Sequence, residues 1–366
     1  MKTITLCLTA PYGVLFRAWG EYDPTARGAY SFARSFQLPT PSTVAGLICN
    51  LLTSRKPLPP PPPKNWIGEY MHVLKECGIK YLRGPFLMSK KDIYVPLGGR
   101  DMLGYRLVRI NDAIDFVREL CRCIEKLKNE KNLKKIEEEL ERMEKTLGRV
   151  EKIKHLIPIV KPRTGVGLNV RVSGIKSAKE GLIYTCSRIV GFKDGLSEEP
   201  LEEWKMAIEI CVEKPEVIPE SFVSRLGGDA TVVIGEVLDR CPLEEHIRRQ
   251  AQSGEDLLLL LISPLIVEPG GTQEGKSLVR LIWGSMSVLG MGFSGLWHRR
   301  RPIEHVITPG SVLALEGGIA PGLLELYCTP EDFLSRLIVS PIPRWYSIKK
   351  PQFAIGYGTF LPFTAS

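Results

Sequence analysis

The strongest local constraint on this chain is a run of prolines, Pro57-Leu58-Pro59-Pro60-Pro61-Pro62-Pro63. Proline fixes φ and lacks a backbone N–H, so the run fits neither a helix interior nor a central strand. It predicts an extended polyproline connector that ends any helix before it. A helix is predicted just upstream, because Thr40 suits an N-cap, Pro41 suits the first helical position, and one apolar face follows: Val44, Leu47, Ile48, Leu51 and Leu52.

A charged segment, residues 112–154, predicts an inserted antiparallel helical hairpin. Its second arm has a heptad seam and its first arm has similar apolar spacing; the seam is Leu133, Ile136, Leu140, Met143, Leu147 and Val150. The segment holds 12 basic and 11 acidic residues, so the remainder of the chain, with 37 and 30, carries nearly all of the net charge of +8. The balanced charge favours a hairpin that packs on itself or on a neighbouring subunit over an arm that reads nucleic acid.

From residue 158 onward the pattern changes to strands and glycine turns. Strands are expected over 181–192, 207–212, 231–238, 257–267 and 312–315, with a last strand around 353–363. Thr329 and Pro330 predict the start of a capped helix. The sequence therefore predicts an α+β protein of two ferredoxin-like (RRM-like, split βαβ) modules, 1–245 and 246–366, with the hairpin in the first.

Composition narrows the class of protein. The pI of about 8.9 favours a nucleic-acid partner over an acidic membrane. The longest apolar run, 257–267, is too short to span a bilayer, and no signal peptide is visible. The nine scattered cysteines predict buried free thiols in a reducing cytoplasm rather than a zinc site. We therefore expect a cytoplasmic protein with no membrane contact, metal or cofactor.

The N-terminal loop, 12–36, is the first candidate RNA-binding element. It holds Arg17, Arg27 and Arg34, interleaved with six aromatic residues between Phe16 and Phe36, and it leads into the N-terminus of the helix capped by Thr40. Guanidinium groups bind phosphates and aromatic faces stack on unpaired bases. A surface loop that packs over its own aromatic residues is an equally good interpretation of the composition.

Two further cationic elements follow. Lys161, Arg163 and Arg171 flank a glycine-rich stretch, 165–169, which predicts either a phosphate-binding turn or a plain β-turn. The densest run is His298-Arg299-Arg300-Arg301, and a run of three arginines between glycine-rich strands favours RNA contact over a solvated face. No nucleophile, base or metal-ligand set is apparent, and none of the five histidines precedes residue 72.

Several motifs, taken together and in order, resemble the Cmr subunit 3 family, which are RAMP proteins of the type III-B CRISPR effector (Cmr) complex. The motifs are Leu15-Phe16-Arg17, the segment 38–46 (Leu-Pro-Thr-Pro-Ser-Thr-Val-Ala-Gly), Arg163-Thr164-Gly165, Leu226-Gly227-Gly228-Asp229, Gly295-Leu296-Trp297 and Gly356-Tyr357-Gly358. The chain departs from the family near Cys49, where an arginine is often found. The 112–154 hairpin also has no counterpart.

The resemblance implies two ferredoxin-like RAMP domains and no catalysis. It implies capture of the repeat-derived 5′ tag of the CRISPR RNA (crRNA), pairing with the large polymerase/cyclase-like subunit, and contact with other RAMP subunits. It adds Ser42, Thr43, Gly356 and Gly358 to the candidate RNA-binding residues. Two alternatives remain open: a RAMP endoribonuclease that processes the guide precursor, although the N-terminal region lacks a histidine base, and a structural subunit that contacts only protein.

Overall fold

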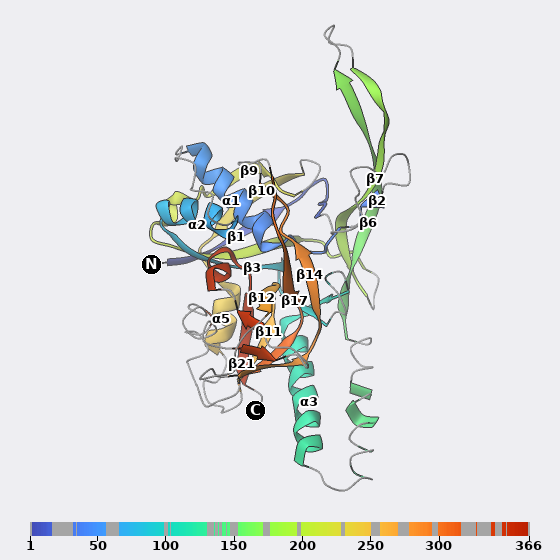
Figure 1. Cartoon of the computed structure of the whole chain (residues 1–366), viewed down its shortest axis with the longest axis vertical. Coiled ribbons are helices and arrows are strands. Elements are labelled where there is room, and N and C mark those ends of the chain that lie inside the picture. Colours follow the sequence, from blue (N-terminus) through green and yellow to red (C-terminus); the bar gives the residue numbers. More distant parts are fainter. Residues whose placement is uncertain are drawn as a thin grey trace.

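The fold is seen in a computed structural model (Figure 1). It describes residues 2–16, 32–33, 35–55, 66–98, 102, 104–129, 135, 138, 141–143, 145–146, 153–170, 176–195, 199–227, 231–249, 257–269, 278–294, 299–315, 327, 338–340, 346–348 and 350–364. Side chains of 32–33, 128–129, 164–170, 176–185, 269, 278, 293–294, 299–300, 338–340, 346–348 and 350–351 lie outside this description. The predicted polyproline connector also falls outside it.

The first half forms a ten-stranded sheet. Its order is β2-β7-β6-β5-β4-β3-β8-β1-β10-β9. In that order the strands are β2 (Phe32–Ala33), β7 (Lys176–Asp194), β6 (His155–Val170), β5 (Arg106–Arg109), β4 (Ile93–Leu97), β3 (Ile79–Ser89), β8 (Trp204–Val212), β1 (Lys2–Thr9), β10 (Val232–Leu238) and β9 (Ser221–Arg225).

The second half forms a nine-stranded sheet of order β14-β17-β12-β20-β19-β13-β18-β11-β21. These strands are β14 (Met286–Gly290), β17 (Ile303–Ile307), β12 (Leu265–Pro269), β20 (Tyr346–Ile348), β19 (Ile338–Ser340), β13 (Leu278–Trp283), β18 (Val312–Leu315), β11 (Leu257–Leu261) and β21 (Phe360–Thr364). A separate ribbon pairs β15 (Phe293–Ser294) with β16 (Arg299–Arg300).

The same arrangement of four strands recurs in both sheets. In the first half it is β3-β8-β1-β10 and in the second β13-β18-β11-β21, and every neighbouring pair in both sets is antiparallel. Most of the extra strands are inserted at the same point of the chain in each half. In the first half β4–β7 lie between β3 and β8 in the sequence, and in the second half β14–β17 lie between β13 and β18. The mixed, mainly antiparallel architecture confirms the α+β class.

The helices follow the sequence patterns closely. α1 (Pro41–Arg55) begins one residue after Thr40, as predicted, and buries Val44, Leu47 and Ile48. α2 (Trp66–Glu76) packs beside it, and the short α5 (Pro242–Arg249) connects the halves. Two 3₁₀ turns, η1 (Pro215–Val217) and η2 (Lys350–Ile355), complete the described elements. No described helix has the length and apolar character needed to cross a membrane.

The first arm of the predicted hairpin is α3 (Ile110–Asn129), and the described positions between 135 and 146 are also helical. Thr146 donates to the Glu119 carboxylate at 3.4 Å, so the arms lie side by side. Of the predicted seam only Met143 is described, and it packs against the core. α3 also covers the second sheet, where Phe116 lies 5.2 Å from Trp283 between ring centroids.

Two strand predictions and one turn prediction are corrected. The apolar run 257–267 is two strands, β11 and β12, because the chain turns at Ser263-Pro264 and the strands enter different parts of the sheet. The predicted strand 353–363 is mostly turn, with β21 beginning at Phe360. Residues 165–169 are no turn: they lie inside β6, which pairs with β7 along its length.

The junction between the halves is rich in buried polar groups. Arg83 on β3 is only 1% exposed and donates to the carbonyls of Leu82, Tyr327 and Phe353. Opposite it on β8 lies Glu209, which is fully buried. The Glu209 carboxylate accepts from the Leu243 amide at 2.7 Å and from the Tyr327 hydroxyl at 2.8 Å. This carboxylate therefore holds the start of α5 and a second-half residue against the first sheet.

Glu209 makes the stability of this junction depend on pH. Burial raises the pKa of its carboxyl from 4.5 to about 7, so between these values unfolding releases a proton. The contribution of Glu209 to the free energy of unfolding is fully present below about pH 4.5 and falls by up to about 3 kcal/mol as pH rises to 7.

The Glu209→Gln variant removes the titrating group but keeps the shape of the side chain. We expect its stability, measured by urea denaturation from pH 5 to 8, to lose this slope relative to the wild type. Parallel pH profiles of the two proteins would show that Glu209 does not titrate in this range.

Candidate nucleic-acid interface

The long hairpin of β6 and β7 projects from the body of the molecule, at the opposite end of the long axis from α3 (Figure 1). At its base lies an open groove of about 570 Å³. The residues that line it come from the β6–β7 hairpin, from the turn after β1 and from the start of β10: Tyr12, Lys161, Pro162, Arg163, Arg188, Val190, Thr231 and Val232. The groove is therefore built by segments that are far apart in the sequence.

The lining is cationic. Lys161 and Arg163 are exposed and two residues apart on β6, so their side chains leave the same face of the strand about 7 Å apart along it. Arg188 on β7 stands directly opposite Lys161 in the antiparallel register and is 5% exposed. The described lining residues include three cations and no carboxylate.

The N-terminus of α1 lies in the junction rather than beside this groove. Ser42 is buried, and its hydroxyl accepts from the Tyr357 hydroxyl at 3.1 Å. Burial raises the pKa of Tyr357 to about 12, so this hydroxyl stays a neutral donor at physiological pH. Thr43 is partly exposed, and its hydroxyl lies 3.0 Å from that of Thr40. The turn that ends at Gly358 thus anchors the second half on the first turn of α1.

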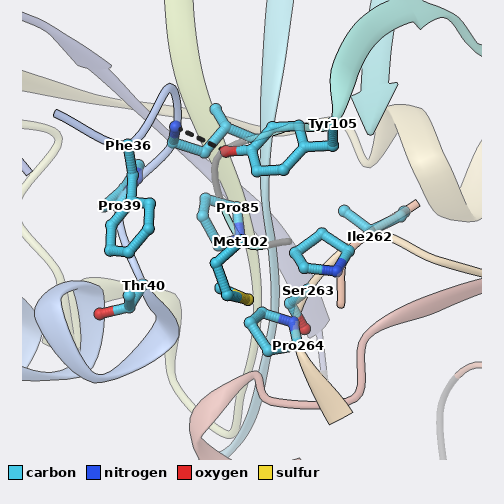
Figure 2. Close-up of a pocket in the computed structure, with 11 residues that line it drawn as sticks. Phe36, Pro39, Thr40, Pro85, Met102, Tyr105, Ile262, Ser263 and Pro264 are labelled. Carbon is cyan, nitrogen blue, oxygen red and sulfur yellow. Dashed lines mark hydrogen bonds between the residues drawn. The ribbon is translucent and has the colours of Figure 1, made fainter. Parts of the chain in front are cut away.

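A small cavity sits beside this helix start (Figure 2). Its volume of about 20 Å³ admits about one water molecule, so it cannot hold a base or a phosphate. Its walls come from both halves, including Phe36, Pro85 and Pro264, and the Tyr105 hydroxyl accepts from the Leu38 amide at one side. Gly356 and Gly358 also lie in buried backbone at this junction, with φ of +91° and +66°.

Arg301 is held inside the fold. Its guanidinium pairs with Glu69 of α2 at 2.9 Å, lies 4.6 Å from the centre of the Tyr70 ring and donates to the Tyr70 hydroxyl. The side chains of Arg301 and Glu69 are only 11% and 6% exposed. Nearby, the Trp66 indole donates to Glu304 at 3.2 Å. Together these contacts fasten α2 to the chain that follows β16.

The other predicted RNA-binding residues fall into two groups, those that line the groove and those whose side chains the structure does not describe. Lys161 and Arg163 line the groove, whereas Arg17, Arg27, Arg34, Arg171 and His298 lie outside the described residues. For Arg299 and Arg300 the described backbone forms β16. The structure thus brings together two of the predicted residues and adds Tyr12 and Arg188, which the sequence analysis missed. Arg188 has no cationic neighbour in the sequence, and only the β6–β7 register reveals its place.

The groove offers binding rather than acid–base chemistry. Its described lining has no histidine, cysteine, aspartate or glutamate. Elsewhere among the described residues no group of three or more metal-ligating side chains is assembled, and the eight described cysteines are free.

Comparisons with known proteins agree with one another. A family model described as CRISPR-associated protein (Cas_Cmr3) matches residues 14–327. A chain of the type III-B Cmr-beta bound to cognate target RNA is similar, with a TM-score of 0.56 and 16% identity over 85% of this chain and 86% of that chain. A chain of the same assembly bound to cognate target RNA and AMPPnP gives 0.58 and 15% over 97% and 95%. No curated protein matches the chain.

Replacing Arg301 should mainly affect stability. Removing one partner of a buried ion pair leaves the other charge unpaired, so we expect Arg301→Ala to lower the free energy of unfolding by about 3 kcal/mol. Arg248→Ala is a matched control, since the Arg248 side chain is 59% exposed and its pair with Glu244 is worth about 0.5 kcal/mol. Equal effects of the two variants in denaturant titrations would show that the Arg301–Glu69 ion pair does not stabilise the fold.

Proposed function

The chain belongs to the Cas_Cmr3 family of CRISPR-associated proteins, and we propose on this basis that it is a guide-RNA-binding subunit of a type III-B CRISPR effector complex. It holds the repeat-derived 5′ tag of the crRNA and docks the large polymerase/cyclase-like subunit, alongside other RAMP subunits. The proposal gives this chain no catalytic step. Under it, each four-strand set is the core of a ferredoxin-like RAMP module, and α5 lies at the boundary between 1–245 and 246–366.

The observation that carries the RNA-binding part is the cationic groove at the base of β6 and β7. RNA phosphates need cations that are spaced along a track, and Lys161, Arg163 and Arg188 supply three of them. The groove is open, which suits a strand that continues past it. Arg171, which follows β6 in the sequence, and Arg299 and Arg300 of the β15–β16 ribbon are the further contacts that we propose for the same guide. Arg17, Arg27 and Arg34 of the N-terminal segment stay proposed contacts, as does His298, which precedes Arg299 in the sequence.

The junction residues take a different part in the proposal. Ser42, Arg301, Gly356 and Gly358 are engaged between the halves, so we assign them to holding the modules in register. The protein would then bind the tag through side chains at the rim and through the rigid spacing that these buried contacts impose. Thr43, which is partly exposed, remains a candidate for contact with the RNA itself.

The part of the proposal that concerns a protein partner rests on an exposed edge. β9 ends the first sheet, and Val223 on it stands directly opposite Ile234 of β10. These side chains are 70% and 45% exposed. Aliphatic side chains neither stack on bases nor bind phosphate, and an open strand edge can pair with a strand of another protein. We assign this edge to the large subunit.

The groove is tested with the Lys161→Ala, Arg163→Ala double variant. Each lost phosphate contact should lower the slope of log affinity against log salt by about 0.7 for single-stranded RNA. Fluorescence anisotropy with a labelled crRNA over a salt series measures this slope. Arg122→Ala, an exposed cation on α3 at the opposite end of the molecule, is the control and should change nothing. Unchanged slopes in both proteins would remove the groove from the RNA interface.

The docking edge is tested with Val223→Lys. Because Val223 is exposed, the free energy of unfolding should change by no more than about 0.5 kcal/mol. Affinity for the large subunit, measured by co-purification and by biolayer interferometry, should fall at least about 5-fold if Val223 contributes over 1 kcal/mol. Ile303→Lys, a 69% exposed site in the second sheet, is the matched control. Equal binding by both variants would place the partner elsewhere.

A further inference from the structure

Tyr12 is the most exposed of the large apolar side chains described, at 73%, and it lines the cationic groove. A single exposed aromatic residue is common on protein surfaces. The feature that distinguishes Tyr12 is its support. It sits on a tight turn after β1 that is closed by a hydrogen bond from the Gly13 amide to the Ala10 carbonyl at 3.1 Å.

This turn is fixed onto β7. Val14 and Ile189 exchange two backbone hydrogen bonds, of 2.8 and 2.9 Å. Gly13 has φ +74°, and a Cβ at that position would lie 2.7 Å from the Ile189 carbonyl oxygen. The close approach therefore requires glycine. Because Ile189 follows Arg188 directly, the same pair of hydrogen bonds places the Tyr12 ring beside the cations of the groove.

The cations of the groove lie along β6 and so define the direction in which a bound strand would run. Lys161 and Arg163 lie about 7 Å apart along β6 on one face, a spacing that suits successive phosphates of an extended single strand. A strand held in this way presents unpaired bases, and an exposed ring fixed beside the phosphates is a stacking surface. The aliphatic wall of Val190 and Val232 adds apolar surface next to the ring.

We propose that Tyr12 is a base-stacking residue, and that the groove accepts an extended single strand, whose phosphates lie on Lys161 and Arg163 while one base rests on the Tyr12 ring. This inference rests on the proposed function and adds to it the conformation of the ligand and the residue that senses the base. It also explains why a turn that interacts so closely with β7 carries a large ring directed to solvent.

The test separates base contacts from phosphate contacts. Two labelled probes of equal length are used with the full chain: single-stranded oligoadenylate and the corresponding abasic ribose-phosphate strand. Tyr12→Ala should weaken binding of oligoadenylate by about 5- to 150-fold, the range expected for one stacked base, and should leave binding of the abasic strand unchanged. Tyr12→Phe keeps the ring and should bind both probes as the wild type does.

The Lys161→Ala, Arg163→Ala variant is measured in parallel and should weaken binding of both probes, with a lower salt slope. If Tyr12→Ala weakens binding of the two probes equally, or of neither, while the cation variant weakens both, the stacking role is wrong and the RNA groove stands. If the cation variant also binds both probes normally, the groove is not an RNA interface and the proposed function of this site falls with it. Thermal melting checks that each variant is folded, and Tyr12 is exposed enough for its replacement to leave the melting temperature unchanged.

Discussion

The arrangement of the two sheets depends on guanidinium groups buried between them. Arg83 comes from the first sheet, yet two of its backbone acceptors, at Tyr327 and Phe353, belong to the second half. A buried charge without such acceptors would cost far more than the contact returns. The buried Arg83 guanidinium of the first half therefore has all of its hydrogen-bond acceptors only when the second half is in place. Arg301 repeats the relationship in the opposite direction, since a second-half guanidinium is neutralised by Glu69 of α2.

This constraint changes how the positive charge of the chain should be interpreted. Arg83 and Arg301 add to the net charge of +8, but both make their contacts inside the molecule. Arg301 nevertheless belongs to the densest cationic run in the sequence. The groove at β6 and β7 is cationic for a different reason: strand register brings Lys161 and Arg188 together from positions 27 residues apart. The same residue type can thus join two parts of the fold or line a groove, and the surroundings distinguish the two cases: Arg301 faces the Glu69 carboxylate, whereas the described lining of the groove has no carboxylate.

Backbone contacts position both the proposed binding residues and the residues that join the two halves. The turn that carries Tyr12 is bonded to β7, and β7 is the strand that carries Arg188. The glycines at 356 and 358 meanwhile allow a buried turn to reach the start of α1, where Tyr357 contacts Ser42 and lies 5.9 Å from Trp66 between ring centres. Motifs that resembled RNA-binding elements in the sequence therefore include residues whose contacts hold the two sheets in register.

The sequence by itself determined the α+β class, α1 with its first residue, the α3 hairpin arm and, through ordered motifs, the family. These depend on local rules such as capping and periodicity, or on residues that lie close together along the chain. Only the tertiary structure decided that 165–169 is strand, that Arg301 faces Glu69 and that Arg188 joins Lys161. A charged side chain looks the same in a sequence whether it meets a carboxylate or solvent, and strand register is set by pairing between distant segments. Which cations meet a carboxylate and which line a groove is consequently a property of the packed sheets.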